Sequence, residues 1–251
     1  MDHMFDLSGK VAMVTGANAG IGQAIAIALA KSGADIAAVG RTRATETQEK
    51  VIALGRRAVI IDADLSTIAP IAALVNKTLD AVGRIDILVN NAGIIRRADA
   101  VNFTEADWDA VIDTNLKSVF FLSQAIGRHM IERGSGKIIN IASMLSFQGG
   151  IRVPSYTASK SGVVGLTKLL ANEWAAKGIN VNAIAPGYIA TANTAALRDD
   201  AERNQSIMAR IPAGRWGNPE DLSGAAVFLA SSASDYVNGH TLAVDGGWLA
   251  R

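Results

Sequence analysis

Short apolar runs rich in valine and isoleucine recur along the chain, and each is followed by a longer stretch whose apolar residues have helical spacing. Short buried runs that alternate with helical patterns predict parallel strands joined by helices. Because such crossovers are right-handed, we expect an α/β fold of Rossmann type, with a doubly wound parallel seven-stranded sheet and helices on both faces. The predicted strands cover residues 10–15, 35–40, 58–62, 85–90, 137–142, 179–185 and 240–244.

Length and composition add the expectation of a single domain. The chain has 251 residues, of which 49% are apolar, and this suits one domain over residues 1–251 with a sizeable buried core. In a doubly wound sheet, ligands bind beyond the carboxyl ends of the strands. We therefore expect the ligand-binding and catalytic residues at the carboxyl ends of the predicted strands.

Charge and cysteine content narrow the classes of ligand. The net charge is +1 without long runs of one sign, so neither a nucleic acid nor a membrane surface is an expected partner. The absence of cysteine excludes thiolate chemistry, and three histidines without ligand spacing argue against a metal site. The uncharged span between Lys10 and Lys31 is broken by glycines, so it does not predict a membrane helix. We expect a cytoplasmic protein that binds small molecules.

A glycine-rich turn follows the first predicted strand and opens a helix predicted over residues 23–31. Gly16, Gly20 and Gly22 permit a tight turn, and the helix amino end offers free N–H groups to a pyrophosphate. The spacing Gly-x3-Gly-x-Gly differs from the common G-x-G-x-x-G fingerprint. A dinucleotide site is predicted, with a plain strand-to-helix turn as the alternative.

The ends of the second and third strands bear on the choice of dinucleotide. Arg41 stands where an NAD-binding protein usually has an acid, and this favours a 2′-phosphate and NADP. Ala19 in the glycine-rich turn supplies no second cation for that phosphate. Asp64, followed by Leu65, can either accept the adenine amino group or cap a helix expected to start near Thr67.

The fourth strand ends in Asn91-Ala92-Gly93, which can leave room beside a nucleotide or simply form a turn. In the following helix, predicted over residues 105–130, Asn115 lies within an apolar stretch. A mid-helix asparagine is costly unless its amide is used, so it either makes a structural hydrogen bond or orders a water molecule. Between these elements, Arg96 and Arg97 lie in a loop that is either a solvated tip or part of the site.

A serine, a tyrosine and a lysine follow the fifth strand. Ser143 comes at the strand end, and Tyr156 and Lys160 share one face of the next helix. The Ser143 and Tyr156 hydroxyls can reach one carbonyl oxygen, and the Lys160 charge is expected to lower the tyrosine pKa. A cap at Ser143 and a plain helix-surface pair are the alternatives. The combination predicts proton transfer at a carbonyl.

These motifs, taken in order, resemble the short-chain dehydrogenase/reductase family over residues 5–251. The resemblance implies an NAD(P)-dependent oxidoreductase in which Tyr156 donates or accepts the proton, Ser143 holds the substrate oxygen, Lys160 lowers the tyrosine pKa and binds ribose, and Asn115 holds a relay water. The cofactor-binding set that it implies is Gly16, Asn18, Gly20, Ile21, Gly22, Arg41, Asp64, Leu65, Asn91, Ala92, Gly93, Tyr156, Lys160, Pro186, Gly187, Ile189 and Thr191.

The loops that do not serve the cofactor resemble one branch of that family, the 2-deoxy-D-gluconate 3-dehydrogenase type of uronate breakdown. This resemblance implies a deoxy-keto sugar acid as substrate and slightly favours NAD(H), although Arg41 allows NADP(H). A guanidinium group pairs well with a sugar-acid carboxylate. The expected substrate residues are Arg96, Arg97, Met144, Gln148 and Arg152.

The sequence is also compatible with other functions. Within enzymes they are reduction of a 4-deoxy-5-hexoseulose uronate or of a 3-oxoacyl thioester, although acidic acyl carriers would want a basic face that a net charge of +1 does not indicate. A non-catalytic nucleotide-binding scaffold is the alternative outside enzymes. The polar segment at about 190–215 is expected to be a substrate lid, and the family resemblance implies a homotetramer built on the helix that carries Tyr156.

Overall fold

The chain folds around one parallel sheet of seven strands, in a computed structural model that describes residues 4–251. The predicted fold class is confirmed, while residues 1–3 of the predicted domain lie outside the described part. The sheet order is β3-β2-β1-β4-β5-β6-β7, so the direction of winding reverses between β1 and β4. The strands are β1 Val11–Thr15, β2 Asp35–Gly40, β3 Ala58–Asp62, β4 Ile87–Asn90, β5 Gly136–Ile141, β6 Ile179–Pro186 and β7 Thr241–Val244.

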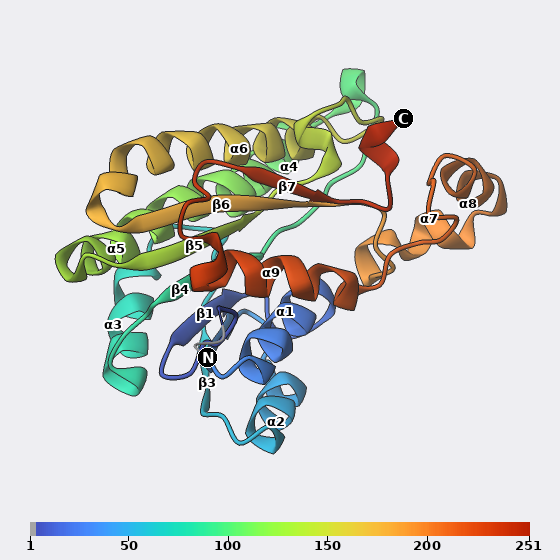
Figure 1. The fold of residues 1–251 in the computed structure, drawn as a ribbon. Coiled ribbons are helices and arrows are strands. Elements are labelled where there is room, and N and C mark those ends of the chain that lie inside the picture. The colour runs from blue at the N-terminus through green and yellow to red at the C-terminus, as the bar shows by residue number, and fades with distance from the viewer. Residues whose placement is uncertain (1–3) are drawn as a thin grey trace.

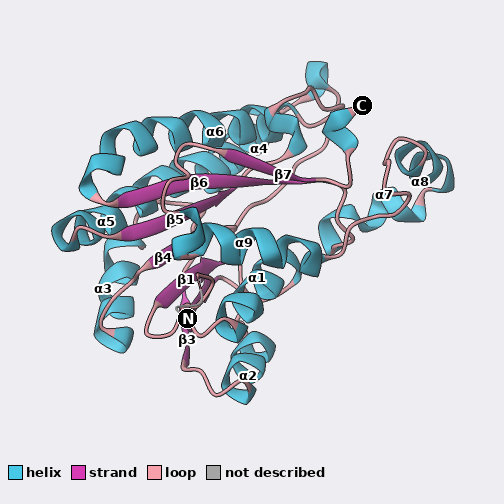
Figure 2. Cartoon of the chain, viewed as in Figure 1, coloured by secondary structure: helices cyan, strands magenta, loops and turns pink. Residues whose placement is uncertain are grey.

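Helices cover both faces of the sheet, and Figures 1 and 2 show the strands as a layer between them. Helices α1, α2 and α9 lie on one face, and α3, α5 and α6 lie on the other. The helices are α1 Gly20–Lys31, α2 Thr45–Ala53, α3 Ile71–Val82, α4 Glu105–Ile112, α5 Ser118–Arg133, α6 Pro154–Trp174, α7 Ala195–Asp199, α8 Ala201–Met208 and α9 Ser223–Ala230.

Alternation along the strands divides the core into two layers. In β1, Ala12 and Val14 pack with the α1 and α9 layer, while Met13 packs with the α3, α5 and α6 layer. All three side chains are fully buried. A strand covered on both faces is apolar on both, which explains why the strands read as unbroken apolar runs.

Two predicted helices differ from the structure in detail. The helix expected over residues 105–130 starts at Glu105 and continues to Arg133, but it contains a π-helical turn at Asp113–Lys117, which holds the buried Asn115. The helix expected near Thr67 starts only at Ile71, and Asp64 instead accepts the backbone N–H of Ser66 in a turn, at 2.9 Å. Periodicity alone does not register the π-helical turn, because an extra residue in one turn hardly alters the apolar pattern.

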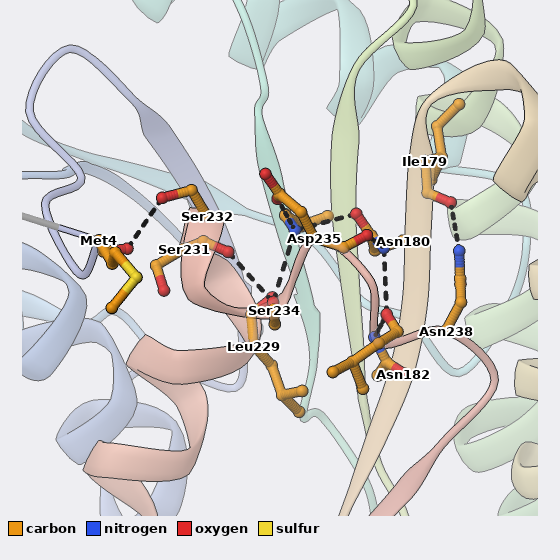
Figure 3. Close-up of polar contacts among 12 residues, drawn as sticks. Met4, Ile179, Asn180, Asn182, Leu229, Ser231, Ser232, Ser234, Asp235 and Asn238 are labelled. Carbon is orange, nitrogen blue, oxygen red and sulfur yellow. Dashed lines mark hydrogen bonds and ion pairs between the residues drawn. The ribbon is translucent and has the colours of Figure 1, made fainter. Parts of the chain in front are cut away.

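The amino edge of the sheet is closed by side-chain amides that bind backbone groups (Figure 3). Asn180 donates to the backbone oxygen atoms of Asp235 and Val237, both at 3.0 Å. Asn182 donates to the Val237 oxygen at 2.9 Å, and Asn238 donates to the Ile179 oxygen at 3.2 Å. These bonds fix the loop before β7 to β6 at the edge opposite to the strand ends where polar residues gather.

Long irregular segments lie at the carboxyl edge of the sheet. Residues 190–215, called the 190–215 segment below, include α7 and α8, which lie apart from the two helical layers (Figure 1). No helix among residues 4–251 is long and apolar enough to cross a membrane.

Candidate active site

Two cavities meet at the carboxyl edge of the sheet, and Tyr156 lines both. The first, of about 310 Å³, extends from the glycine-rich turn after β1 to the end of β4. The second, of about 450 Å³, lies between the loop after β5 and the 190–215 segment. We call them the dinucleotide cavity and the substrate cavity. Molecules bound in the two cavities would therefore approach one another at the Tyr156 side chain.

The glycine-rich turn forms a cradle that side chains would fill. Gly16 and Gly20 have positive φ angles of +66° and +57°, which favour glycine. A Cβ atom at Gly22 would lie 2.2 Å from the Gly16 oxygen, so only glycine fits there. Helix α1 has no side-chain cap and no acidic residue in its first turn, so its first N–H groups remain available. This arrangement fits the pyrophosphate of a dinucleotide.

Most of the predicted cofactor residues line the dinucleotide cavity. Asn91, just after β4, also connects the end of that strand with the glycine-rich turn, because its amide donates to the backbone oxygens of Thr15 at 2.9 Å and Gly16 at 3.2 Å. The predicted residues that line the cavity are Gly16, Asn18, Gly20, Ile21, Gly22, Asn91, Ala92, Gly93, Tyr156, Lys160 and Thr191. Four further residues that were not predicted line the cavity: Ile94, Ile141, Ala192 and Asn193. Three of them are plain apolar residues, whose types give no chemical signal.

The other predicted cofactor residues lie outside that cavity wall. Leu65 and Ile189 are buried in the two core layers, and Pro186 ends β6. Gly187 instead lines the substrate cavity.

The predicted adenine and phosphate residues lie together at the ends of β2 and β3. Arg41 is exposed. The pKa of Asp64 is lowered mainly by hydrogen bonds from Ser66, and the charge of Arg41 lowers it further. Neighbouring Arg43 is paired with Asp62 at 3.2 Å. Of these two arginines, Arg41 is the one that forms no ion pair with any described residue.

Ser143, Tyr156 and Lys160 come together as predicted. Ser143 and Tyr156 both line the substrate cavity, and the Lys160 nitrogen lies 5.6 Å from the centroid of the Tyr156 ring. Lys160 is 5% exposed and donates to the backbone oxygen of Ile141 at 2.6 Å. Burial lowers the pKa of its ammonium group to about 8. The end of β5 thus fixes the position of the lysine.

The pKa of Tyr156 differs from the expectation. Burial raises it above the ordinary tyrosine value, and the opposing influences come from the Ser143 hydroxyl and then from the charge of Arg97. The Lys160 ammonium group is directed to the Ile141 oxygen instead. Desolvation of the phenolate therefore outweighs the nearby positive charges in this arrangement.

Asn115 uses its amide for structural hydrogen bonds. Its Oδ1 accepts the Ile94 N–H at 2.8 Å, and its Nδ2 donates to the Ile94 oxygen at 2.8 Å and to Ser159 Oγ at 3.4 Å. The side chain is fully buried. It connects the π-helical turn with the loop after β4 and with α6.

The structure separates the arginines that the sequence grouped together. Arg97, Met144 and Gln148 line the substrate cavity, as predicted. Arg96 and Arg152 do not, and each is paired with an acid: Arg96 with Asp107 at 3.2 Å and Arg152 with Asp99 at 3.1 Å. Three residues that were not predicted line the same cavity from the 190–215 segment and the C-terminal turn: Arg203, Arg210 and Trp248.

The substrate cavity is positively charged. Three arginines line it, Arg97, Arg203 and Arg210, and no aspartate or glutamate does. One wall is apolar, with Met144, Trp248 and other hydrophobic side chains. A cationic cavity with an apolar wall selects small anions, and in particular carboxylates that guanidinium groups can bind.

A larger cavity, of about 1110 Å³, lies at the amino edge of the sheet, away from these residues. Several of its charged side chains are satisfied within the protein: Lys137 pairs with Asp235 at 2.7 Å, and the buried Asp86 carboxylate accepts from Arg84 and from the Val11 N–H. Size therefore does not identify the functional site. The carboxyl edge combines a dinucleotide cradle with tyrosine, lysine and serine, and this defines a dinucleotide-binding oxidoreductase.

Comparison with known proteins agrees with that class. A family model described as enoyl-(acyl carrier protein) reductase matches residues 16–249. The 2-dehydro-3-deoxy-D-gluconate 5-dehydrogenases of Dickeya dadantii and Escherichia coli are each 64% identical over 248 residues, which cover 98% of this chain and 98% of each relative. The chain belongs to the short-chain dehydrogenase/reductase family and is an NAD(P)-dependent oxidoreductase.

A solved structure supports the same assignment. A structure from Agrobacterium tumefaciens with bound NADP, described as a proposed 2-deoxy-D-gluconate 3-dehydrogenase, has a TM-score of 0.94 and 60% identity, with all of both chains covered. The predicted family and its branch resemblance are thereby confirmed.

Proposed function

We propose that the chain interconverts a secondary alcohol and a ketone on a deoxy-keto sugar acid of the 2-dehydro-3-deoxy-D-gluconate type. The observation that carries this proposal is the acid-free, three-arginine cavity that meets the dinucleotide cavity at Tyr156. The names of the two relatives point to the same class of substrate. A neutral sugar would leave these three guanidinium groups, which form no ion pair within residues 4–251, without an anionic partner.

Each site residue then has a role in the proposal. A bound nicotinamide supplies the hydride acceptor or donor. Tyr156 moves the proton of the reacting hydroxyl, and Ser143 hydrogen-bonds the same oxygen. Lys160, held by the Ile141 oxygen at 2.6 Å, places a positive charge beside the phenol and donates to the ribose. Asn115 holds the loop after β4 in place, with a relay water as its further role.

Arg97 belongs to the reacting end of the substrate cavity. Its charge opposes the rise in the Tyr156 pKa, and its Nη2 donates to the Asn193 oxygen at 3.0 Å. Asn193 lines both cavities. We therefore assign to Arg97 the stabilisation of negative charge near Tyr156.

We propose that both dinucleotides are accepted. The branch resemblance favours NAD(H), whereas exposed Arg41 and the NADP bound to the A. tumefaciens relative support NADP(H). The expectations of a lid at about 190–215, of a homotetramer and of a cytoplasmic location are part of the same proposal. Light scattering for mass and cell fractionation for location test the last two.

The experiment is a turnover assay with the purified chain. 2-Dehydro-3-deoxy-D-gluconate is incubated with NAD⁺ or NADP⁺, formation of the reduced dinucleotide is followed by absorbance, and the oxidised carbon is identified by NMR. We expect turnover and a new ketone at carbon 5. A chain that is inactive on this acid but reduces a 4-deoxy-5-hexoseulose uronate or a 3-oxoacyl thioester would contradict the proposal.

A further inference from the structure

Besides Arg97, the substrate cavity is lined by arginines where the 190–215 segment meets the C-terminal turn. The Arg210 guanidinium carbon lies 4.1 Å from the centroid of the Trp248 ring. Its Nη2 donates to Gln148 Oε1 at 3.3 Å, and the same oxygen accepts from Trp248 Nε1 at 3.2 Å. Arg210 is thus held by a stacked ring and a shared acceptor, although its side chain is exposed.

Trp248 is a rigid base for this arrangement. It is 4% exposed and lies against Tyr188, with ring centroids 4.7 Å apart. The Asp245 carboxylate accepts the backbone N–H groups of Gly247 and Leu249, both at 2.9 Å, and so fixes the turn that carries Trp248. A guanidinium group held in this way loses less conformational entropy when it binds an anion.

The glycines before Trp248 allow the turn to pass against the end of the 190–215 segment. Gly247 has a φ angle of +88°, and a Cβ atom there would lie 3.0 Å from Pro212 Cγ. A Cβ atom at Gly246 would lie 3.1 Å from side-chain atoms of Ala213 and Ile211. The Asp245-Gly246-Gly247 sequence therefore brings Trp248 beneath Arg210.

The positive charge of Arg210 is not neutralised within the described part of the chain. No carboxylate of residues 4–251 lies within ion-pair distance of it, in contrast to Arg96, Arg152 and Arg215. Only one of its N–H groups has an acceptor among residues 4–251, so most of its donors can bind a ligand. Arg203 lines the same cavity, but its described hydrogen bonds involve only its backbone.

We propose that Arg210, positioned by Trp248 and Gln148, binds the substrate carboxylate at the wall formed by the C-terminal turn. This inference rests on the proposed function. In a 2-dehydro-3-deoxygluconate that reacts at carbon 5, four bonds separate the carboxylate carbon from the reacting carbon, so the two groups need separate partners. Arg97 serves the end near Tyr156, and Arg210 serves the carboxylate. The spacing between them selects which hydroxyl reaches Tyr156.

The test compares an acid with its neutral counterpart. The substrates are 2-dehydro-3-deoxy-D-gluconate and 3-deoxy-D-fructose, which has a hydroxymethyl group in place of the carboxylate. For the wild type, kcat/KM on the acid should be the higher. In Arg210→Gln we expect this preference to fall roughly 10- to 100-fold, mainly through KM for the acid. Gln148→Ala should lower it less, because the stacking on Trp248 remains.

Controls separate binding from folding and from net charge. Arg210→Lys keeps the charge but loses the planar guanidinium group that can bind a carboxylate through two N–H groups. It should therefore retain more of the preference for the acid than Arg210→Gln does. Arg128→Gln removes an exposed charge on α5 that does not line the cavity, and it should leave the preference unchanged. The dissociation constant for the reduced dinucleotide should stay at the wild-type value in every variant and report an intact fold.

The outcomes distinguish the two proposals. A wild type without turnover on any keto sugar acid contradicts the proposed function, and this inference with it. A wild type that prefers the acid, together with an Arg210→Gln variant that keeps the same preference, contradicts the assignment of Arg210 alone. An equal loss in Arg128→Gln would show a general effect of charge and would also contradict it.

Discussion

The ammonium nitrogen of Lys160 lies 5.6 Å from the centroid of the Tyr156 ring, but its hydrogen bond goes to the backbone oxygen of Ile141, at 2.6 Å. The lysine is thus fixed beside the phenol by the end of β5, while its burial disfavours the charge that the site uses. A buried charge retained beside a reactive group costs stability, and this cost can be measured.

Lys160→Met should stabilise the protein more at pH 7 than at pH 10. The folded-state pKa of Lys160 is about 8, below its ordinary value of 10.5, so the folded state binds fewer protons between these pH values. The wild type therefore gains stability as the pH rises through this window, and the advantage of the variant shrinks by about 2 kcal/mol. Urea unfolding of both proteins at the two pH values measures this difference in the free energy of unfolding. A difference that does not depend on pH would contradict the prediction.

Arg41→Ala should change the choice of dinucleotide. Arg41 is exposed and belongs to no ion pair of the described residues, so its guanidinium group is free to bind a 2′-phosphate. We expect KM for NADP(H) to rise roughly tenfold and KM for NAD(H) to stay constant. Arg43→Ala is the matched control, because Arg43 is paired with Asp62. Equal effects of the two substitutions on NADP(H) would exclude a specific role for Arg41.

Gly22→Ala should damage the dinucleotide cradle. The added Cβ atom would lie 2.2 Å from the Gly16 oxygen and 2.4 Å from Asn91 Nδ2, so the turn must move. The free energy of unfolding should fall by about 1–3 kcal/mol, and the dinucleotide should bind more weakly. Gly224→Ala in α9, where nothing lies within 4 Å of the added atom, should not lower the free energy of unfolding and should leave dinucleotide binding unchanged. Calorimetry and dinucleotide titration measure them, and wild-type binding by Gly22→Ala would be inconsistent with the cradle.

The sheet and the reacting residues were predictable because their signals are local. The strands are buried on both faces, so each reads as an apolar run, and Gly16, Gly20 and Gly22 mark a turn that other residues cannot make. Ser143 lies just after β5 and Tyr156 lies at the start of α6, in the crossover between β5 and β6. Both residues are therefore near the carboxyl edge of the sheet.

The substrate wall was less predictable because its members meet only through tertiary packing. Arg96 and Arg97 are adjacent in sequence, yet Asp107 pairs with the first while the second lines the cavity. Nothing local indicates that Arg210 stacks on Trp248, since the contact depends on how the C-terminal turn returns to the 190–215 segment. The raised pKa of Tyr156 likewise depends on burial, which a spacing of four residues does not reveal.

The most direct test of the whole account is the kcat/KM of Tyr156→Phe on 2-dehydro-3-deoxy-D-gluconate. Removal of the hydroxyl should lower it by ~10²- to 10⁴-fold, since proton transfer is lost, while the dissociation constant of the dinucleotide stays the same. Tyr236→Phe, at a fully exposed tyrosine, is the control and should match the wild type. A Tyr156→Phe variant with near-normal turnover would contradict the assignment of Tyr156 as the proton-transfer residue.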